Sequence, residues 1–130
     1  GGAVGVRALG RVRLFRYEMR RWRDGTIPDI AEVVESPRRL SGDQACARRV
    51  LALVPHAPTP VWGRDELGAG EMWNSNSLVS WLLVRAGVDM SSVAPPVGGR
   101  APGWTAGIAA AQSGAPTADA LVPAARAGAP

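Results

Sequence analysis

The sequence has no lysine, one cysteine and one histidine, and these shortages exclude several kinds of site. Cys46 has no second thiol with which to form a disulfide within the chain, and Cys46 and His56 alone cannot assemble the usual zinc sites. No apolar run approaches the ~20 residues that a membrane-spanning helix needs. No N-terminal segment combines the basic start, apolar stretch and cleavage site of a signal peptide. We therefore expect no disulfide, metal, cofactor or transmembrane segment in this chain.

Large apolar side chains are also scarce. Of the 130 residues, 46% are apolar, but many of these are alanine, and glycine and proline add 16 and 11 positions. A chain of this kind buries only a small core. We expect one domain over residues 1–105 and a flexible Ala/Gly/Pro-rich tail over residues 106–130, where too little apolar surface offsets the chain entropy. The chain starts at Gly1, and we also consider that it is a fragment of a longer domain.

The first part of the chain is rich in arginine, with seven arginines and one acidic residue among residues 1–23. In an extended chain, one side carries Arg13, Phe15, Tyr17, Met19 and Arg21, and the other carries Val12, Leu14, Arg16, Glu18, Arg20 and Trp22. This alternation, with aromatic and β-branched residues, favours a β-strand from Val12 to Trp22. An earlier strand is expected near Ala3 to Leu9, with Gly10 at the turn between the two. The following Asp-Gly pair at residues 24 and 25 is typical of a turn.

Capping residues predict two helices. Ser41 stands three residues before Gln44, the spacing of a capping box, and the helix is expected to run to about Val54. A second helix is expected to begin near residue 74 or 75 and to end at Gly87, a residue suited to a left-handed cap. Together these elements predict an α+β fold, in which a small antiparallel sheet packs on two main helices and a disordered tail follows.

Four short polar residues, Asn74-Ser75-Asn76-Ser77, stand at the start of the second predicted helix. Asparagine and serine are preferred N-cap residues, but a run of four exceeds what capping requires. Backbone amides at a helix start favour developing negative charge. The run therefore suggests either a cap or a nucleophile with its oxyanion site.

This string resembles the nucleophile segment of the permuted papain-like group, which includes NlpC/P60-related proteins, lecithin:retinol acyltransferase-like proteins and PPPDE peptidases. Members start the equivalent helix with asparagine followed by a catalytic cysteine, and Ser75 stands in the position of that cysteine. The chain is also similar, over roughly Phe15 to Val88, to an uncharacterised bacterial domain family with the stretch Trp-Pro-Gly-Pro-Asn-Ser-Asn-Thr-Phe. The resemblance implies a degenerate or serine-variant hydrolase of acyl or amide bonds. Asn74 would start its helix, the amides around Asn76 and Ser77 would bind the oxyanion, and a histidine upstream of Gly1 would act as the base.

Other titratable side chains support two interpretations each. His56 is the candidate base within the chain, or a solvent-facing histidine favoured by the C-terminus of the first helix. Asp65, Glu66 and Glu71 precede the polar run and could orient a base or bind a cation, or be exposed loop carboxylates. Whether the chain is an enzyme is left open by the sequence.

The competing hypothesis is a non-catalytic binding or structural module. In this interpretation the basic strand contacts an anionic partner, either nucleic acid or a membrane surface. The candidate contact residues are Arg13, Arg16, Arg20 and Arg21. The absence of lysine indicates a compositional bias toward arginine, which favours ordinary solvated strand faces instead. We expect a bacterial protein that is soluble as given, either cytoplasmic or associated with a membrane through a segment outside this sequence.

Overall fold

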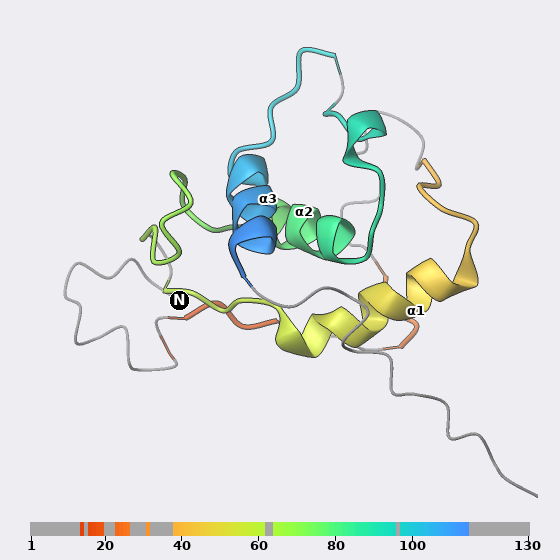
Figure 1. The fold of residues 1–130 in the computed structure, drawn as a ribbon, viewed down its shortest axis with the longest axis horizontal. Coiled ribbons are helices and arrows are strands. Elements are labelled where there is room, and N and C mark those ends of the chain that lie inside the picture. Colours follow the sequence, from red (N-terminus) through yellow and green to blue (C-terminus); the bar gives the residue numbers. More distant parts are fainter. Residues whose placement is uncertain are drawn as a thin grey trace, which may run out of the picture.

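A computed structural model describes residues 14, 16–19, 23–26, 31, 38–61, 64–95 and 97–114 of the chain. This part of the protein contains three α-helices, α1 (Gln44–Leu53), α2 (Ser75–Arg85) and α3 (Trp104–Ser113), and two short 3₁₀-helices, η4 (Val54–His56) and η5 (Met90–Ser92). Helix α3 packs along α2, and α1 contacts α2 from another side (Figure 1). The arrangement is therefore helical, with long loops between the elements.

The antiparallel sheet of the predicted α+β fold is wrong, because the described residues form no strand. Arg16 makes one isolated antiparallel bridge with Val61 and no ladder follows. Pro58 and Pro60 lack the N–H groups that a ladder requires, and a side chain, the carboxylate of Glu66, accepts from the backbone N–H of Val61 at 2.9 Å. The extended segment around Arg16 is consequently held by one backbone hydrogen bond, from the Tyr17 N–H to the Pro60 carbonyl, and by side chains, without a ladder.

The other strand predictions fall largely outside the described residues. This applies to the strand near Ala3 to Leu9, to Gly10, and to most of the strand from Val12 to Trp22. Within that second strand, residues 16–19 are described, and Arg16 alone takes part in a bridge. The prediction of a long strand is thus contradicted where the structure describes it.

Helix α1 begins later than its predicted capping box. Its N-cap is Asp43, whose carboxylate accepts from the N–H groups of Ala45 and Cys46 at 2.8 and 3.2 Å. The Ser41 hydroxyl instead accepts from the N–H of Asp43 at 3.0 Å. An aspartate caps as well as a serine does, and its charge also suits the helix dipole. The helix ends at Leu53, close to the predicted end.

Helix α2 agrees with the prediction at both ends. It follows Asn74 as its N-cap, and Gly87 after it has a φ of 78°. The N–H of Gly87 donates to the carbonyl of Val84, and the N–H of Val88 donates to the carbonyl of Leu83, both at 3.0 Å. This pair of bonds is a Schellman motif, which needs a left-handed residue at the position of Gly87.

Helix α3 lies where a flexible tail was predicted, so that prediction is wrong from Ala106 to Ser113. The segment is rich in alanine, the residue with the highest helix propensity. Its buried residues Ala106, Gly107 and Ala111 are small, which lets the helix axis come close to α2. The prediction weighed only large apolar side chains and therefore missed close packing of small ones. Residues 115–130 lie outside the described part.

The core is small and centres on two tryptophans. Trp73 and Trp81 are 4% and 6% exposed, as expected for indoles that fill the centre of a small domain. Cys46 is buried in the same cluster, where a free cysteine packs as a small apolar residue. The remaining members of this core cluster are Leu53, Ala57, Ala86 and Ala111.

The contact between α2 and α3 yields a stability prediction. A Cβ atom on Gly107 would lie 2.0 Å from both the Ser77 carbonyl oxygen and the Ser80 hydroxyl oxygen. Gly107→Ala should therefore force the helices apart and lower the free energy of unfolding by about 3 kcal/mol or more. Gly42 has open space around it, so Gly42→Ala is a matched control with an expected change under about 1 kcal/mol. Urea unfolding followed by circular dichroism measures both, and equal changes would contradict the packing.

Candidate functional site: the Asn74–Ser77 helix start

Asn74 uses its side chain twice. Its Oδ1 accepts from the N–H groups of Asn76 and Ser77 at 2.8 and 3.2 Å, which caps α2. Its Nδ2 donates to the carbonyl of Pro102 at 2.8 Å. Asn76 donates through its own Nδ2 to the same carbonyl at 3.0 Å. The two asparagines therefore tie the start of α2 to the chain that enters α3.

Ser77 completes this connection from a fully buried position. Its hydroxyl accepts from the N–H of Asn74 at 3.1 Å, which closes the capping box, and donates to the carbonyl of Gly103 at 2.7 Å. The predicted site residue Ser77 is thus a structural hydroxyl with donor and acceptor both used. The Gly103 carbonyl also accepts from the N–H of Gly107 at 3.3 Å, so the Ser77 hydroxyl adds a second bond to it. A typical intramolecular hydrogen bond contributes about 1 kcal/mol, and this one stabilises the contact.

Two further residues extend the same connection. The Ser80 hydroxyl, also fully buried, lies 2.8 Å from the carbonyl oxygen of Trp104 and 3.1 Å from that of Ser77. One carboxylate oxygen of Glu71 accepts from the N–H of Gly103 at 2.9 Å. Ser80 is not among the predicted site residues. The signal that could identify it is its spacing of three residues after Ser77, which places both serines on one helix face.

Gly103 is required for this approach. Its φ is 80°, a conformation that side chains rarely adopt, and a Cβ there would lie 2.5 Å from Asn74 Nδ2 and 2.7 Å from Ser77 Oγ. A glycine thus allows the backbone to reach the asparagine and serine side chains. The run of four polar residues is longer than a helix cap requires because three of them also donate hydrogen bonds to the carbonyls of Pro102 and Gly103.

Ser75, the candidate nucleophile, differs from its neighbours. It is the first residue of α2, it is exposed, and its hydroxyl makes no hydrogen bond with any residue of the described ranges. The predicted oxyanion donors were the amides around Asn76 and Ser77. Both amides already donate to Asn74 Oδ1, so the cap occupies the donors that an oxyanion would need.

His56, the candidate base, lies in η4 and is exposed. Its position after α1 matches the interpretation of a solvent-facing histidine near a helix C-terminus. Among the residues that the structure describes, no hydrogen bond joins His56 to Ser75 or Ser77. The structure therefore does not pair the predicted base with a predicted nucleophile.

The three loop carboxylates are each bound to backbone. Asp65 accepts from the N–H groups of Ala69 and Gly70, both at 2.8 Å, and so closes the loop on itself. Glu71 binds Gly103, and Glu66 binds Val61, as described above. Within the described ranges no three His, Cys, Asp or Glu side chains gather in a way that could hold a metal ion.

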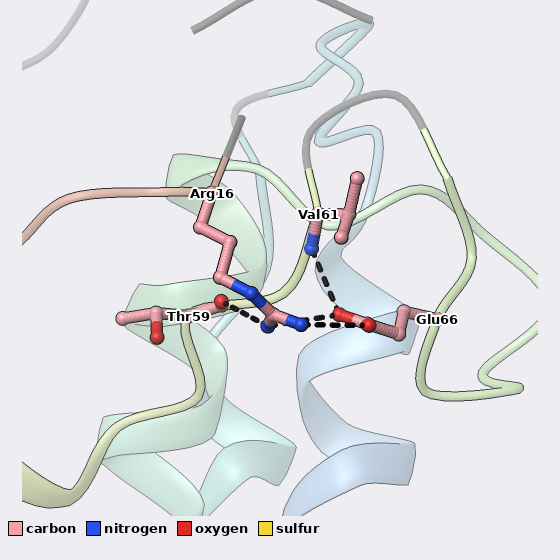
Figure 2. A network of polar contacts seen from close by, with 4 residues as sticks. All are labelled: Arg16, Thr59, Val61 and Glu66. Atoms are coloured by element: carbon pink, nitrogen blue, oxygen red, sulfur yellow. Dashed lines mark hydrogen bonds and ion pairs between the residues drawn. The ribbon is translucent and has the colours of Figure 1, made fainter. Parts of the chain in front are cut away.

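Arg16 is the one member of the predicted basic surface that the structure describes, and it forms an ion pair with Glu66 (Figure 2). Its two terminal nitrogens lie 3.2 and 3.1 Å from the two carboxylate oxygens, and one also donates to the carbonyl of Thr59 at 3.1 Å. Arg13, Arg20 and Arg21 lie outside the described ranges. No sequence signal pointed to this pair, because the two residues are 50 positions apart.

Comparison of the chain with family models, curated proteins and solved structures gave no match. The resemblance to the papain-like group therefore stays a prediction that rests on the short polar string. In the described part of the chain, no helix has the length and apolar character to cross a membrane.

Tyr17 adjoins this site and supplies a pH prediction. Its hydroxyl donates to the carbonyl of Trp73 at 2.6 Å, and burial raises the pKa of the phenol above its ordinary value near 10. The folded protein holds this proton more tightly than the unfolded chain does. The stabilising contribution is therefore complete below pH about 10 and is lost as the pH rises through the raised pKa.

Titration can test this directly, because Tyr17 is the only tyrosine and lysine is absent. Tyrosinate absorbance should give a higher pKa in the native protein than in urea. Unfolding free energies measured between pH 8 and 11 should fall less steeply in Tyr17→Phe than in the parent chain. Equal pKa values in the two states would contradict the prediction.

Proposed function

We propose that this domain is a non-catalytic binding or structural module. The observation that supports this proposal is that the polar residues at the start of α2 make hydrogen bonds to other parts of the domain. The amides of Asn76 and Ser77 and the hydroxyl of Ser77 all have partners within the capping box or in the segment that enters α3. In this proposal the Asn-Ser run builds the α2–α3 contact instead of hydrolysing a bond.

The chemistry of serine supports the same proposal. A serine hydroxyl attacks an acyl carbon only with a general base within about 2.6–3.2 Å of it. Ser75 has the exposure that a nucleophile needs, and this favours the hydrolase as the second candidate. Within the described residues, Ser75 has neither a hydrogen-bonded base nor a vacant pair of amides nearby. A place in the first turn of α2 accounts for a serine at this position without any catalytic partner.

An activity probe separates the two candidates. A fluorophosphonate that labels reactive serines should leave the folded chain unlabelled. Ser75→Ala should change the free energy of unfolding by under about 0.5 kcal/mol, because its side chain is exposed. Ser77→Ala should lower it by about 1–3 kcal/mol, because the Asn74 N–H loses its acceptor and the Gly103 carbonyl loses one of its two donors.

Labelling that disappears in Ser75→Ala and persists in the destabilised Ser77→Ala would overturn the non-catalytic proposal. Circular dichroism of each variant shows whether the labelled chain is folded. The probe and the stability measurements together assign each serine to one role.

The binding role that we propose is contact with an anionic partner, and the surface near α1 supports it. Residues 38–61 contain four arginines and one acidic residue. Arg39 and Arg48 are exposed, the first before α1 and the second on it. Arg16 is less suited to this contact, since its guanidinium already faces a carboxylate. Arginines bind phosphate and sulfate groups through paired N–H donors.

Retention on heparin as a function of salt tests this surface. The double variant Arg39→Gln with Arg48→Gln should elute at lower salt than the parent chain, because two cation contacts are lost. The matched control, Arg23→Gln with Arg100→Gln, removes the same charge at two exposed positions elsewhere and should shift elution less. Equal shifts in the two double variants would show that retention reports net charge alone.

A further inference from the structure

We propose that residues Arg16–Met19 form a detachable strap, which can leave the domain while α2 and α3 stay packed and which is released by breaking the ion pair between Arg16 and Glu66. The proposal is independent of the function suggested above. It rests on how this segment is attached and on which surface it covers.

The attachment through Arg16 is ionic and partly open to solvent. The Arg16 and Glu66 side chains are each 35% exposed, and their nitrogen and oxygen atoms approach to 3.1 Å. Figure 2 shows the guanidinium lying between the carboxylate of Glu66 and the carbonyl of Thr59. Paired contacts of arginine with a carboxylate are the stronger kind of surface ion pair, yet dissolved salt still screens them.

Glu66 joins the two segments that the strap brings together. One of its oxygens accepts both from Arg16 and from the N–H of Val61. Loss of its charge therefore weakens the hold on Arg16 and on the loop at Val61 together. The same carboxylate fixes the position at which the single β-bridge between Arg16 and Val61 forms.

The next residue of the strap covers the core. The N–H of Tyr17 donates to the carbonyl of Pro60 at 3.1 Å, and its hydroxyl donates to the carbonyl of Trp73. Tyr17 and Met19 pack against the core cluster that contains Trp73. Val61 and Trp73 are 1% and 4% exposed with the strap in place. Departure of the strap would open one side of the core around these two residues.

The α2–α3 contact does not depend on these bonds. It is held by the buried hydroxyls of Ser77 and Ser80, which bind the carbonyls of Gly103 and Trp104. None of the bonds described for the strap reaches α3. Segments attached through exposed polar contacts open at a lower free energy than buried helix contacts do. The strap and the helix pair are therefore separate units of stability.

Amide hydrogen exchange of the full chain under native conditions tests the proposal. The reporter is the N–H of Tyr17, since its acceptor, Pro60, is untouched by the substitutions. The test variant is Glu66→Gln, which removes the charge and keeps the size. The control is Asp43→Asn, which also removes one negative charge beside an arginine, Arg49 at 3.9 Å, and keeps the helix cap.

Glu66→Gln should speed exchange at Tyr17 by about threefold to tenfold, as expected for loss of a partly exposed ion pair. The amides of α2 and α3 should keep their protection, and Asp43→Asn should leave Tyr17 unchanged. Added salt should speed exchange at Tyr17 in the parent chain and have less effect in Glu66→Gln.

Two results would overturn the proposal. If Glu66→Gln speeds exchange at Tyr17 and within α2 and α3 by the same factor, the strap opens only with the whole domain. If exchange at Tyr17 does not change, the ion pair does not hold the strap. If Asp43→Asn speeds exchange at Tyr17 as much as Glu66→Gln does, the ion pair of Glu66 with Arg16 likewise does not hold the strap, because loss of an unrelated negative charge has the same effect.

Discussion

The close contact between α2 and α3 is the constraint on which the rest of this structure depends. Ser77 and Ser80 face α3 from fully buried positions, and Gly107 lets the backbones meet there. A domain with few large apolar side chains gains less in total from burying them, so close packing of small residues and buried hydrogen bonds contribute a larger share of its stability. Helix α2 therefore buries its serines against α3 as well as Trp81 in the core cluster, and several of its leucines and valines are half-buried or exposed.

Side-chain-to-backbone hydrogen bonds organise the loops around this helix pair. The three carboxylates that precede α2 each accept from backbone N–H groups, and Glu71 accepts from a distant part of the chain, at Gly103. Loops without a sheet must satisfy their amides in another way, and carboxylates do so with charge-assisted bonds. In the part of the chain that the structure describes, the irregular segments around α2 are thereby held without strands.

The polar helix start illustrates how one pattern can fit two functions. Asparagine and serine at a helix N-terminus suit an oxyanion site when their amides face solvent, and they suit a cap when the first asparagine folds back over those amides. In this chain Asn74 occupies the amides of Asn76 and Ser77, and its other end binds Pro102. The cap itself is local, since Asn74 reaches amides two and three residues further on. The Pro102 carbonyl that accepts from the other end of Asn74 belongs to a distant segment, and a short motif does not encode it.

Local features were therefore determined by the sequence, and contacts between distant segments were decided by the tertiary structure. The cap at Asn74, the left-handed Gly87 and the buried tryptophans follow from residue types and their near neighbours, because backbone conformation and hydrophobicity act over a few residues. Helix α3 and the pairing of Arg16 with Glu66 join residues that are 24 to 50 positions apart. The predicted sheet failed for the same reason, since a strand requires a partner and the prolines around Val61 do not offer one.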